Sequence, residues 1–281
     1  MKEIIVAIDF SKGSLYALEL AIDIANKTNA NIMMVWVDSE TDTDSEFLAM
    51  GSEARNDAKL HIEKIQTEYQ PKLVNSTLSY KLRKGRVYSE IANQAKYNDA
   101  DLIIAGTHGA SGFEKMWMGS NAFRIVTYAP CPVITIRYGF NFKKKLEKII
   151  LPIDSSPDTR QKVPFACKMA KYFDAEIHIL GLYTTTLKAI RRKVDTYVSQ
   201  VEKYMEENHA KYVTNFVEAD NTTTTTIEYS QQINADLVVI MTEQEKTAAN
   251  FWLGPYAQQM VNNSPIPVLS IQPIEINNSA R

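Results

Sequence analysis

Cysteine is rare in this chain of 281 residues, which contains only Cys131 and Cys167. Two cysteines cannot build the disulfide framework of a small secreted domain, and they fit a reducing cytoplasm best. Cys131 precedes an apolar, strand-like segment and Cys167 lies on an apolar helical stripe, so we interpret both as buried residues rather than nucleophiles. We therefore expect a cytoplasmic protein without disulfide bonds.

Long apolar runs and an excess of either charge are also absent. No apolar run reaches the ~18 residues that indicate a membrane-spanning helix. The apolar segment at the start is interrupted by Asp9 and lacks a cleavage pattern, which favours a strand over a signal peptide. The net charge of −2 provides no field that would attract nucleic acid or an acidic membrane. We therefore expect neither of these partners.

Metal-binding and catalytic patterns are not recognisable in the sequence. The histidines are scattered, and none stands at metal-ligand spacing from a cysteine. His108 could act as a general base, but no nucleophile or carboxylate is evident beside it, so we favour a surface or contact role. Lys115 could equally neutralise a phosphate or be a solvated lysine. We predict no metal site and no catalytic residue.

What the sequence does contain is a duplication. The segment Glu3–Ser11 (EIIVAIDFS) matches Lys148–Ser156 (KIILPIDSS), and Asn31–Val37 matches Glu176–Leu182 at the same offset. The offset then becomes ten residues shorter, which places a deletion after the second strand of the second copy. Three more pairs follow: Ala100–Thr107 with Ala235–Thr242, Trp117–Ser120 with Trp252–Pro255, and Ala129–Ile136 with Ser264–Ile271. We predict two domains, 1–140 and 146–275.

Each copy alternates strand and helix patterns. Segments such as IIVAID and DLIIAG are short continuous apolar runs, typical of strands that are buried on both faces. Between them, residues 14–29 place Leu18, Ala21 and Ile22 on one helical stripe, and a second helix ends before Pro71. The alternation predicts an α/β fold with two tandem doubly wound, mainly parallel five-stranded sheets flanked by helices. Ligands bind such Rossmann-like sheets beyond the carboxyl ends of the strands.

The segment Gly106–Ser120 (GTHGASGFEKMWMGS) follows an apolar strand, where such a sheet would bind a ligand. Glycines allow backbone N–H groups to approach an anion closely. Gly119 and Ser120 open a helix whose positive end favours negative charge, and Ser120 could donate to a phosphate or only cap the helix. The segment lacks the Gly-Lys-Ser/Thr of a P-loop, and the first strand is not followed by the G-x-G-x-x-G of a dinucleotide site.

The pattern Gly106-x-x-Gly109, nine residues, Gly119-Ser120 and then APCPV resembles the ATP-binding type of the universal stress protein family. The resemblance covers both halves and implies a tandem member with an adenine nucleotide alpha hydrolase-like fold. It implies that the first domain binds ATP or ADP, with or without Mg²⁺. The nucleotide-binding residues that it implies are Ala7, Asp9, Val37, Ala105, Gly106, Gly109, Ser111, Gly112, Gly119, Ser120 and Asn121.

The resemblance also implies a role for each residue. Ala7 and Asp9 would lie against the adenosine moiety, and Val37 would offer its backbone to adenine. Ala105 and Gly106 would contact ribose or the first phosphate, and the others would hold the phosphates. Asp9 has a structural alternative, because an aspartate after a strand often caps the next helix; the two roles are compatible.

The second copy departs from this pattern. At the positions of Gly106, Gly109 and Ser120 it has Met241, Gln244 and Pro255, and only Asp154 and Gly254 persist. Methionine and glutamine would fill the cradle, and proline removes an N–H group. We expect the second domain not to bind ATP in this way and to serve as a partner of the first.

These features favour a regulatory, nucleotide-binding stress-response protein with little or no hydrolysis. We find no convincing base, metal-binding carboxylate pair or arginine finger for phosphoryl transfer, so at most a weak ATPase is expected. Two alternatives stay open: a nucleotide-independent scaffold or interaction module, and an enzyme that uses ATP. By analogy with single-copy members, the two domains are expected to pair within the chain as a pseudo-dimer, and a homodimer of chains is a further possibility.

Overall fold

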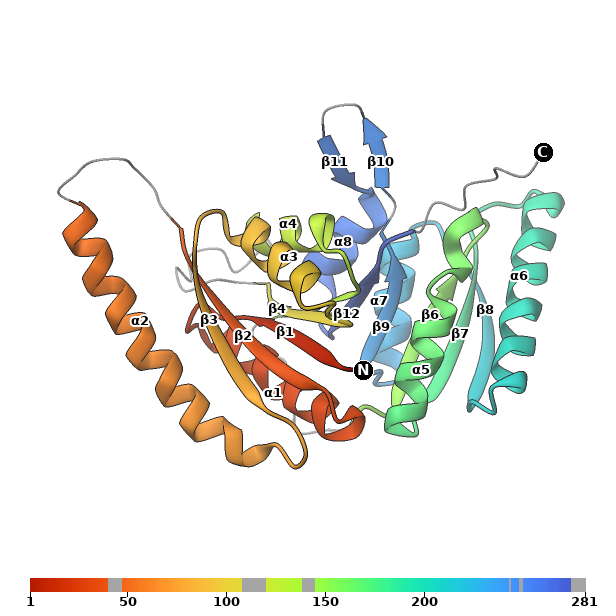
Figure 1. The fold of residues 1–281 in the computed structure, drawn as a ribbon. Helices are drawn as coiled ribbons and strands as arrows, with labels where there is room; N and C mark the ends of the chain where they lie inside the picture. The colour runs from red at the N-terminus through yellow and green to blue at the C-terminus, as the bar shows by residue number, and fades with distance from the viewer. Residues whose placement is uncertain (40–46, 108–119, 138–144, 243, 248–249, 274–281) are drawn as a thin grey trace, which may run out of the picture. The chain divides into compact units, whose positions relative to one another are not determined.

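The computed structural model describes residues 1–39, 47–107, 120–137, 145–242, 244–247 and 250–273. The chain divides into two compact units, Met1–Lys143 and Lys144–Arg281 (Figure 1). Each unit is an α/β structure with a parallel sheet and helices packed on it, as the alternating sequence pattern predicts. The two units are described in turn.

The first unit contains a five-stranded parallel sheet. The strands stand in the order β3 (Leu78–Lys84), β2 (Asn31–Asp38), β1 (Glu3–Ala7), β4 (Leu102–Gly106) and β5 (Val133–Ile136). The chain moves outward from β1 to β3 and then returns to β4 on the other side of β1. The strand order therefore reverses between β1 and β4, which is where doubly wound sheets bind ligands.

Four helices of the first unit are described: α1 (Lys12–Thr28), α2 (Phe47–Tyr69), α3 (Val87–Tyr97) and α4 (Ser120–Tyr128). Helix α1 packs on β1, β2 and β4, and α2 packs on β3 and ends just before the 3-10 turn that contains Pro71. Helix α3 packs on β1 and β2 and against α4. Right-handed crossovers place the first pair and the second pair on opposite faces of the sheet.

The core of the first unit forms where the central strands meet α1. Ile4, Ile5 and Val6 are fully buried, and no inside–outside alternation occurs along β1, as expected for a strand covered on both faces. On α1 the predicted stripe is buried at Leu18 and Ile22. Among the described residues, no helix is long and apolar enough to cross a membrane.

The second unit repeats the sheet. Its parallel strands stand in the order β12 (Val268–Ile271), β9 (Leu237–Met241), β6 (Lys148–Ile153), β7 (Glu176–Tyr183) and β8 (Tyr212–Glu218). This order is the one found in the first unit, with each strand in the corresponding place. The predicted fold of tandem, doubly wound parallel sheets is therefore confirmed.

The helices of the second unit differ from those of the first at their beginnings. They are α5 (Val163–Phe173), α6 (Lys188–Glu207), α7 (Thr222–Gln232) and α8 (Pro255–Asn263). A short 3-10 helix, η2 (Pro157–Arg160), stands where α1 has its first turn. The threonine run lies inside α7, whose N-cap Asn221 accepts a hydrogen bond from the Thr224 N–H at 3.0 Å.

A hairpin in the second unit was not predicted. Strands β10 (Gln244–Thr247) and β11 (Asn250–Leu253) pair antiparallel, with Gln244 opposite Leu253. The sequence analysis treated this stretch only as the counterpart of the glycine-rich segment. The two strands of the hairpin stand in the sequence between β9 and α8.

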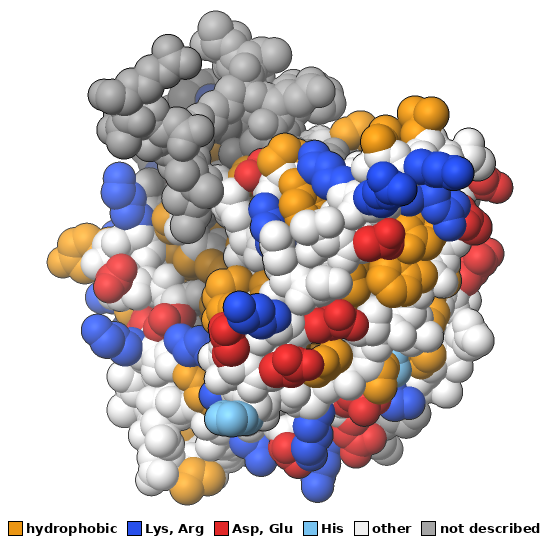
Figure 2. All heavy atoms as spheres, turned by 90° about the vertical axis from the view of Figure 1, so that its right-hand side faces the viewer, with side chains coloured by type: hydrophobic (Ala, Val, Ile, Leu, Met, Phe, Trp, Pro, Cys, Tyr) orange, Lys and Arg blue, Asp and Glu red, His pale blue; other side chains and the backbone are white. Residues whose placement is uncertain are grey.

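One face of the second unit, around α6 and the edge strand β8, shows basic and acidic side chains interspersed with hydrophobic ones (Figure 2). Tyr183 stacks on Phe216 with ring centroids 5.4 Å apart. Arg191 lies 3.9 Å over the Tyr183 ring and forms an ion pair with Glu218 at 2.7 Å. The two signs of charge are mixed on the visible face, which agrees with the near-neutral net charge of −2.

Candidate functional site

The carboxyl ends of β1, β2 and β4 lie side by side in the first unit. Ala7 pairs with Val35 in the register of β1 and β2, and the Ile8 N–H donates to the Val35 carbonyl at 3.0 Å. Ala105 and Gly106 end β4 on the other side of β1. The structure therefore brings Ala7, Val37, Ala105 and Gly106 to the same edge of the sheet.

Asp9 organises the turn between β1 and α1. Its Oδ1 accepts a hydrogen bond from the Ser11 N–H at 3.0 Å, and its own N–H donates to the Ser14 Oγ at 3.4 Å. The N-cap of α1 is Ser11, whose Oγ accepts from the Ser14 N–H at 3.2 Å. The helix cap considered for Asp9 is therefore supplied by Ser11, and Asp9 instead holds the turn two residues before the cap.

Gly106 is required by packing inside the protein. A Cβ at this position would lie 2.8 Å from the Gly13 carbonyl carbon and 3.1 Å from the Ser14 nitrogen. Both obstacles are backbone atoms of the first turn of α1, so they cannot move aside as a side chain would. The sequence analysis assigned this glycine to a ligand; the structure shows that contact between β4 and α1 already demands it.

The remaining predicted residues are only partly described. Ser120 and Asn121 form the first turn of α4 and are exposed. Four predicted residues lie outside the described residues: Gly109, Ser111, Gly112 and Gly119. His108, Lys115 and Trp117 lie outside them too.

An aromatic group at the same edge was missed by the sequence analysis. Phe10 stacks on Trp36 with ring centroids 6.3 Å apart and also contacts the His61 ring at 5.5 Å. Phe10 has a φ of +64°, which is rare for a bulky residue and is held only where the surroundings fix it. Nothing in the local sequence signals a positive φ at phenylalanine, so the contact emerged only from the structure.

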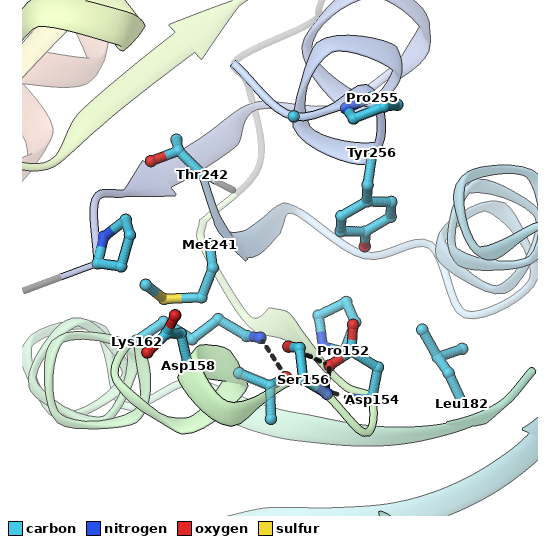
Figure 3. A pocket seen from close by; sticks show the side chains of 13 residues that line it. Pro152, Asp154, Ser156, Asp158, Lys162, Leu182, Met241, Thr242, Pro255 and Tyr256 are labelled. Atoms are coloured by element: carbon cyan, nitrogen blue, oxygen red, sulfur yellow. Dashed lines mark hydrogen bonds between the residues drawn. The ribbon is translucent and has the colours of Figure 1, made fainter. Parts of the chain in front are cut away.

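The corresponding edge of the second unit contains a cavity of about 280 Å³ (Figure 3). Asp154 repeats the turn of Asp9, with the Ser156 N–H donating to its Oδ1 at 2.9 Å and its own N–H donating to Thr159 Oγ1 at 3.2 Å. Met241 stands in the place of Gly106, and Pro255 in the place of Ser120; both line the cavity. The predicted filling of the cradle by methionine is therefore incomplete, because space remains.

Lys162 is the main chemical difference between this edge of the second unit and the corresponding edge of the first. It occupies the position of Ala17 in the first unit, and only 3% of its surface is exposed. Its ammonium donates to Thr159 Oγ1 at 3.2 Å and interacts electrostatically with Asp154. The sequence analysis did not single out this lysine, although a lysine opposite an alanine of the repeat is a visible signal.

The charge on Asp154 is held by its surroundings. Burial acts to raise the pKa of this carboxyl, but the positive charge of Lys162 and the donors of Ser156 and Thr159 outweigh it, so the pKa lies below its ordinary value. Asp154 is therefore ionised and engaged at neutral pH. The Ser156 hydroxyl also donates to Asp154 Oδ1, at 2.6 Å.

Neither cysteine has the properties of a nucleophile. Both cysteines are free; Cys167 is buried and Cys131 is half-buried rather than fully buried as expected. Burial, with a smaller contribution from Asp101, raises the pKa of Cys131 to about 12, which disfavours the nucleophilic thiolate. No group of three or more potential metal ligands occurs within the described ranges.

Comparison with known proteins points to one family. A model of the universal stress protein family matches residues 1–137 and 145–272, so it covers both units. A universal stress protein from Archaeoglobus fulgidus has a crystal structure similar to this chain, with a TM-score of 0.78 at 16% identity, covering 96% of this chain and 98% of that one. At that identity the likeness shows the fold alone.

A relative of one half is more similar in sequence. A universal stress protein of Methanocaldococcus jannaschii is 29% identical over 147 residues, covering 48% of this chain and 82% of that protein. That relative corresponds in length to a single unit, whereas this chain carries two in tandem.

Proposed function

We propose that this chain, which belongs to the universal stress protein family, binds ATP or ADP in its first unit and acts as a regulatory protein with little or no hydrolysis. The nucleotide would lie across the carboxyl ends of β1 and β4, where the strand order reverses. The residues proposed to hold it are those that the family resemblance implies, from Ala7 and Asp9 at the adenosine end to Ser120 and Asn121 at the phosphate end.

One contrast between the units carries the proposal. Asp9 is half-buried, and its Oδ1 accepts one hydrogen bond, from Ser11, while its other carboxylate oxygen has no hydrogen bond within the described part of the chain. In the second unit, Lys162 adds a positive charge beside the equivalent Asp154, where the first unit has Ala17. An acceptor of this kind at a strand end suits the hydroxyl groups of a ribose.

The exposed start of α4 supports the proposal that the phosphates of the nucleotide bind there. Ser120 and Asn121 present the first-turn N–H groups of a nine-residue helix, and such groups favour an anion through their hydrogen bonds and the helix dipole. The second unit has Pro255 at the equivalent place, which removes one donor. Magnesium would bind through the phosphates rather than through a protein cluster.

Isothermal titration calorimetry of the full chain with ADP and with ATP tests the proposal. We expect about one site per chain. Asp9→Ala should weaken binding about tenfold, by loss of a hydrogen bond to a charged group, whereas the matched Asp154→Ala should leave affinity unchanged. Gly109→Val should abolish binding and Gln244→Val should not. Two equivalent sites, or no binding at millimolar nucleotide, would refute the proposal.

A chromatographic assay for ADP release addresses the enzymatic alternative. We expect turnover well below ordinary enzyme rates, which are of the order of 1–1,000 per second. Rates in that range would make the protein an ATPase. Two predictions from the sequence stay predictions: that the two domains pair within the chain, and that two chains pair with each other.

A further inference from the structure

Helix α6 carries its charges in the reverse of the order that favours a helix. Its first two turns contain basic residues and no acidic one: Lys188, Arg191, Arg192 and Lys193. Its last two turns are mainly acidic, with Glu202, Glu206 and Glu207. Because the helix dipole is positive at the N-terminus, cations there and anions at the other end both lower helix stability. This arrangement costs stability unless other groups offset it.

The acidic end of α6 is accounted for by contacts inside the second unit. Glu202 accepts a hydrogen bond from Thr214 Oγ1 at 2.7 Å. Glu206 accepts one from the Tyr212 hydroxyl at 2.9 Å. Both donors belong to the neighbouring strand β8, so these carboxylates tie the end of the helix to the sheet.

The basic end of α6 has far fewer partners. Arg191 forms an ion pair with Glu218 at 2.7 Å. The other three cations are exposed, and the ion pairs of the described residues do not include Lys188, Arg192 or Lys193. Lys188 and Arg192 also stand four residues apart on the helix, where like charges repel. The described part of the fold therefore gives no reason for these three charges.

Apolar side chains lie beside these cations. Leu187, directly before the helix, is 62% exposed, and Phe216 on β8 is 44% exposed. Figure 2 shows several basic side chains close together in the upper part of this face, with hydrophobic ones next to them. We call this surface the α6 patch and define it by Leu187, Lys188, Arg191, Arg192, Lys193 and Phe216.

The carboxylates at the α6 patch do not neutralise it. Those that interact with Arg191 are Glu218 and Asp195. Glu218 is held by Arg191 itself, and Asp195 accepts a hydrogen bond from the Tyr183 hydroxyl. The patch therefore has more positive than negative charge, and its surplus lies on exposed side chains.

Nucleic acid and lipid fit this surface poorly. Bases would need open aromatic faces, but Tyr183 is already covered by Arg191 at 3.9 Å and stacked with Phe216. A membrane-binding helix needs a broad apolar face, and Leu187 is the strongly exposed aliphatic residue at this end of α6. A peptide with a few carboxylates and one apolar side chain requires only what the patch contains.

We propose that the α6 patch docks an acidic segment of a partner protein. Carboxylates of that segment pair with Lys188, Arg192 and Lys193, and an apolar side chain of the segment packs against Leu187. Because the chain as a whole has a net charge of −2, the attraction is local and sensitive to salt. This surface is separate from the nucleotide site proposed for the first unit and does not depend on it.

An NMR titration of the isotope-labelled full chain tests the proposal. The probe is a short peptide of glutamate and serine with one central leucine, and its control has glutamine in place of every glutamate. We expect the glutamate peptide to bind with a Kd of about 1 mM or tighter at low salt and to shift the amide signals of the α6 patch. The glutamine peptide should bind about tenfold more weakly, because its ion pairs are lost, and about 0.5 M salt should abolish the difference.

Variants distinguish binding from folding. Lys188→Gln with Arg192→Gln should weaken binding of the glutamate peptide about threefold to tenfold. The matched control is Lys168→Gln with Lys203→Gln, which removes two exposed lysines outside the patch and should leave binding unchanged. The patch variant should also unfold at the same or a higher urea concentration than the parent, because repulsion at the helix start is relieved. Leu187→Ser should weaken binding about threefold through lost apolar contact.

Several results would overturn the proposal. Equal binding of the two peptides, equal effects of the two double variants, or no shift of patch signals up to about 5 mM peptide would remove the acidic partner. Lower stability of the patch variant would mean that the cations serve the fold. Tighter, patch-dependent binding of phosphatidylserine vesicles or of single-stranded poly-uridylate, or self-association that the patch variant abolishes, would assign the surface to another occupant. None of these results bears on nucleotide binding, which is measured with the Asp9 variant.

Discussion

Gly106→Ala separates a glycine needed by the fold from one needed by a ligand. The added methyl group would meet the Gly13 carbonyl carbon at 2.8 Å and the Ser14 nitrogen at 3.1 Å. These atoms belong to the capped first turn of α1, which Ser11 and Asp9 hold by hydrogen bonds. Either β4 or the start of α1 has to shift, and this cost arises in the protein without any nucleotide.

The size of the effect follows from the opposing contributions. Overpacking of this kind costs about 1–3 kcal/mol, while alanine recovers about 0.4–1 kcal/mol because it has less freedom than glycine when unfolded. We expect a net loss of about 1–2 kcal/mol in the free energy of unfolding of the first unit. For a unit of this length, that corresponds to a fall in Tm of about 3–8 °C.

Gly181→Ala is the matched control in the second unit. Its methyl group would come even closer to a neighbour, 2.5 Å from Phe216 Cδ1, but that neighbour is a side chain that is 44% exposed and can rotate away. We therefore expect Gly106→Ala to cost more than Gly181→Ala, although its nearest distance is longer.

The assay is urea unfolding of the nucleotide-free chain, with hydrogen exchange of peptides from α1 and α5 assigning each transition to a unit. Earlier exchange in α1 of Gly106→Ala is the expected result. If this variant is as stable as the parent and loses only nucleotide affinity, the packing argument fails and Gly106 serves the ligand alone.

Three further predictions concern charge and capping. Burial lowers the pKa of His178 and outweighs the opposing effect of Glu176, whose Oε1 lies 3.1 Å from its Nε2. The unfolded state then binds the proton more readily, so urea midpoints should fall as the pH drops below about 6.5, and His178→Asn should remove this fall. The pKa of Asp154 is depressed in the folded state. Its ionised form therefore stabilises the fold above the ordinary carboxyl pKa of about 3.9, and this stability is lost as the pH falls through the depressed pKa. Asp154→Asn should flatten the acid limb of thermal unfolding. Ser11→Ala should cost about 1 kcal/mol by loss of the α1 cap, and Ser11→Gly only a few tenths, as urea unfolding would measure.

The repeat made the fold readable from the sequence. Two copies of the same alternation predicted the parallel strands, their places and the deletion in the second copy, because buried parallel strands need continuous apolar runs that few other structures use. The hairpin β10–β11 escaped prediction because its residues have neither an apolar run nor a strong turn signal, and only their pairing makes them strands.

The candidate site, too, could be predicted from the sequence only in part. The strand pattern predicted that ligands bind at the carboxyl ends of the parallel strands, which share one edge, and the family resemblance named Ala7, Ala105 and Gly106 there. The sequence could not show why position 106 is glycine, because close packing against α1 and close approach of a phosphate both require glycine there.

Residue type and periodicity by themselves determined the α/β class, the duplication and the edge at which a ligand would bind, because these depend on short-range patterns and on the pairing rules of parallel strands. Only the tertiary structure decided that Gly106 meets the backbone of α1 and that Lys162 reaches Asp154 across the start of α5. It alone revealed that Met241 leaves a cavity. The first and the third depend on distances between segments far apart in the chain, and the second depends on how the chain turns between β6 and α5; no local pattern encodes them.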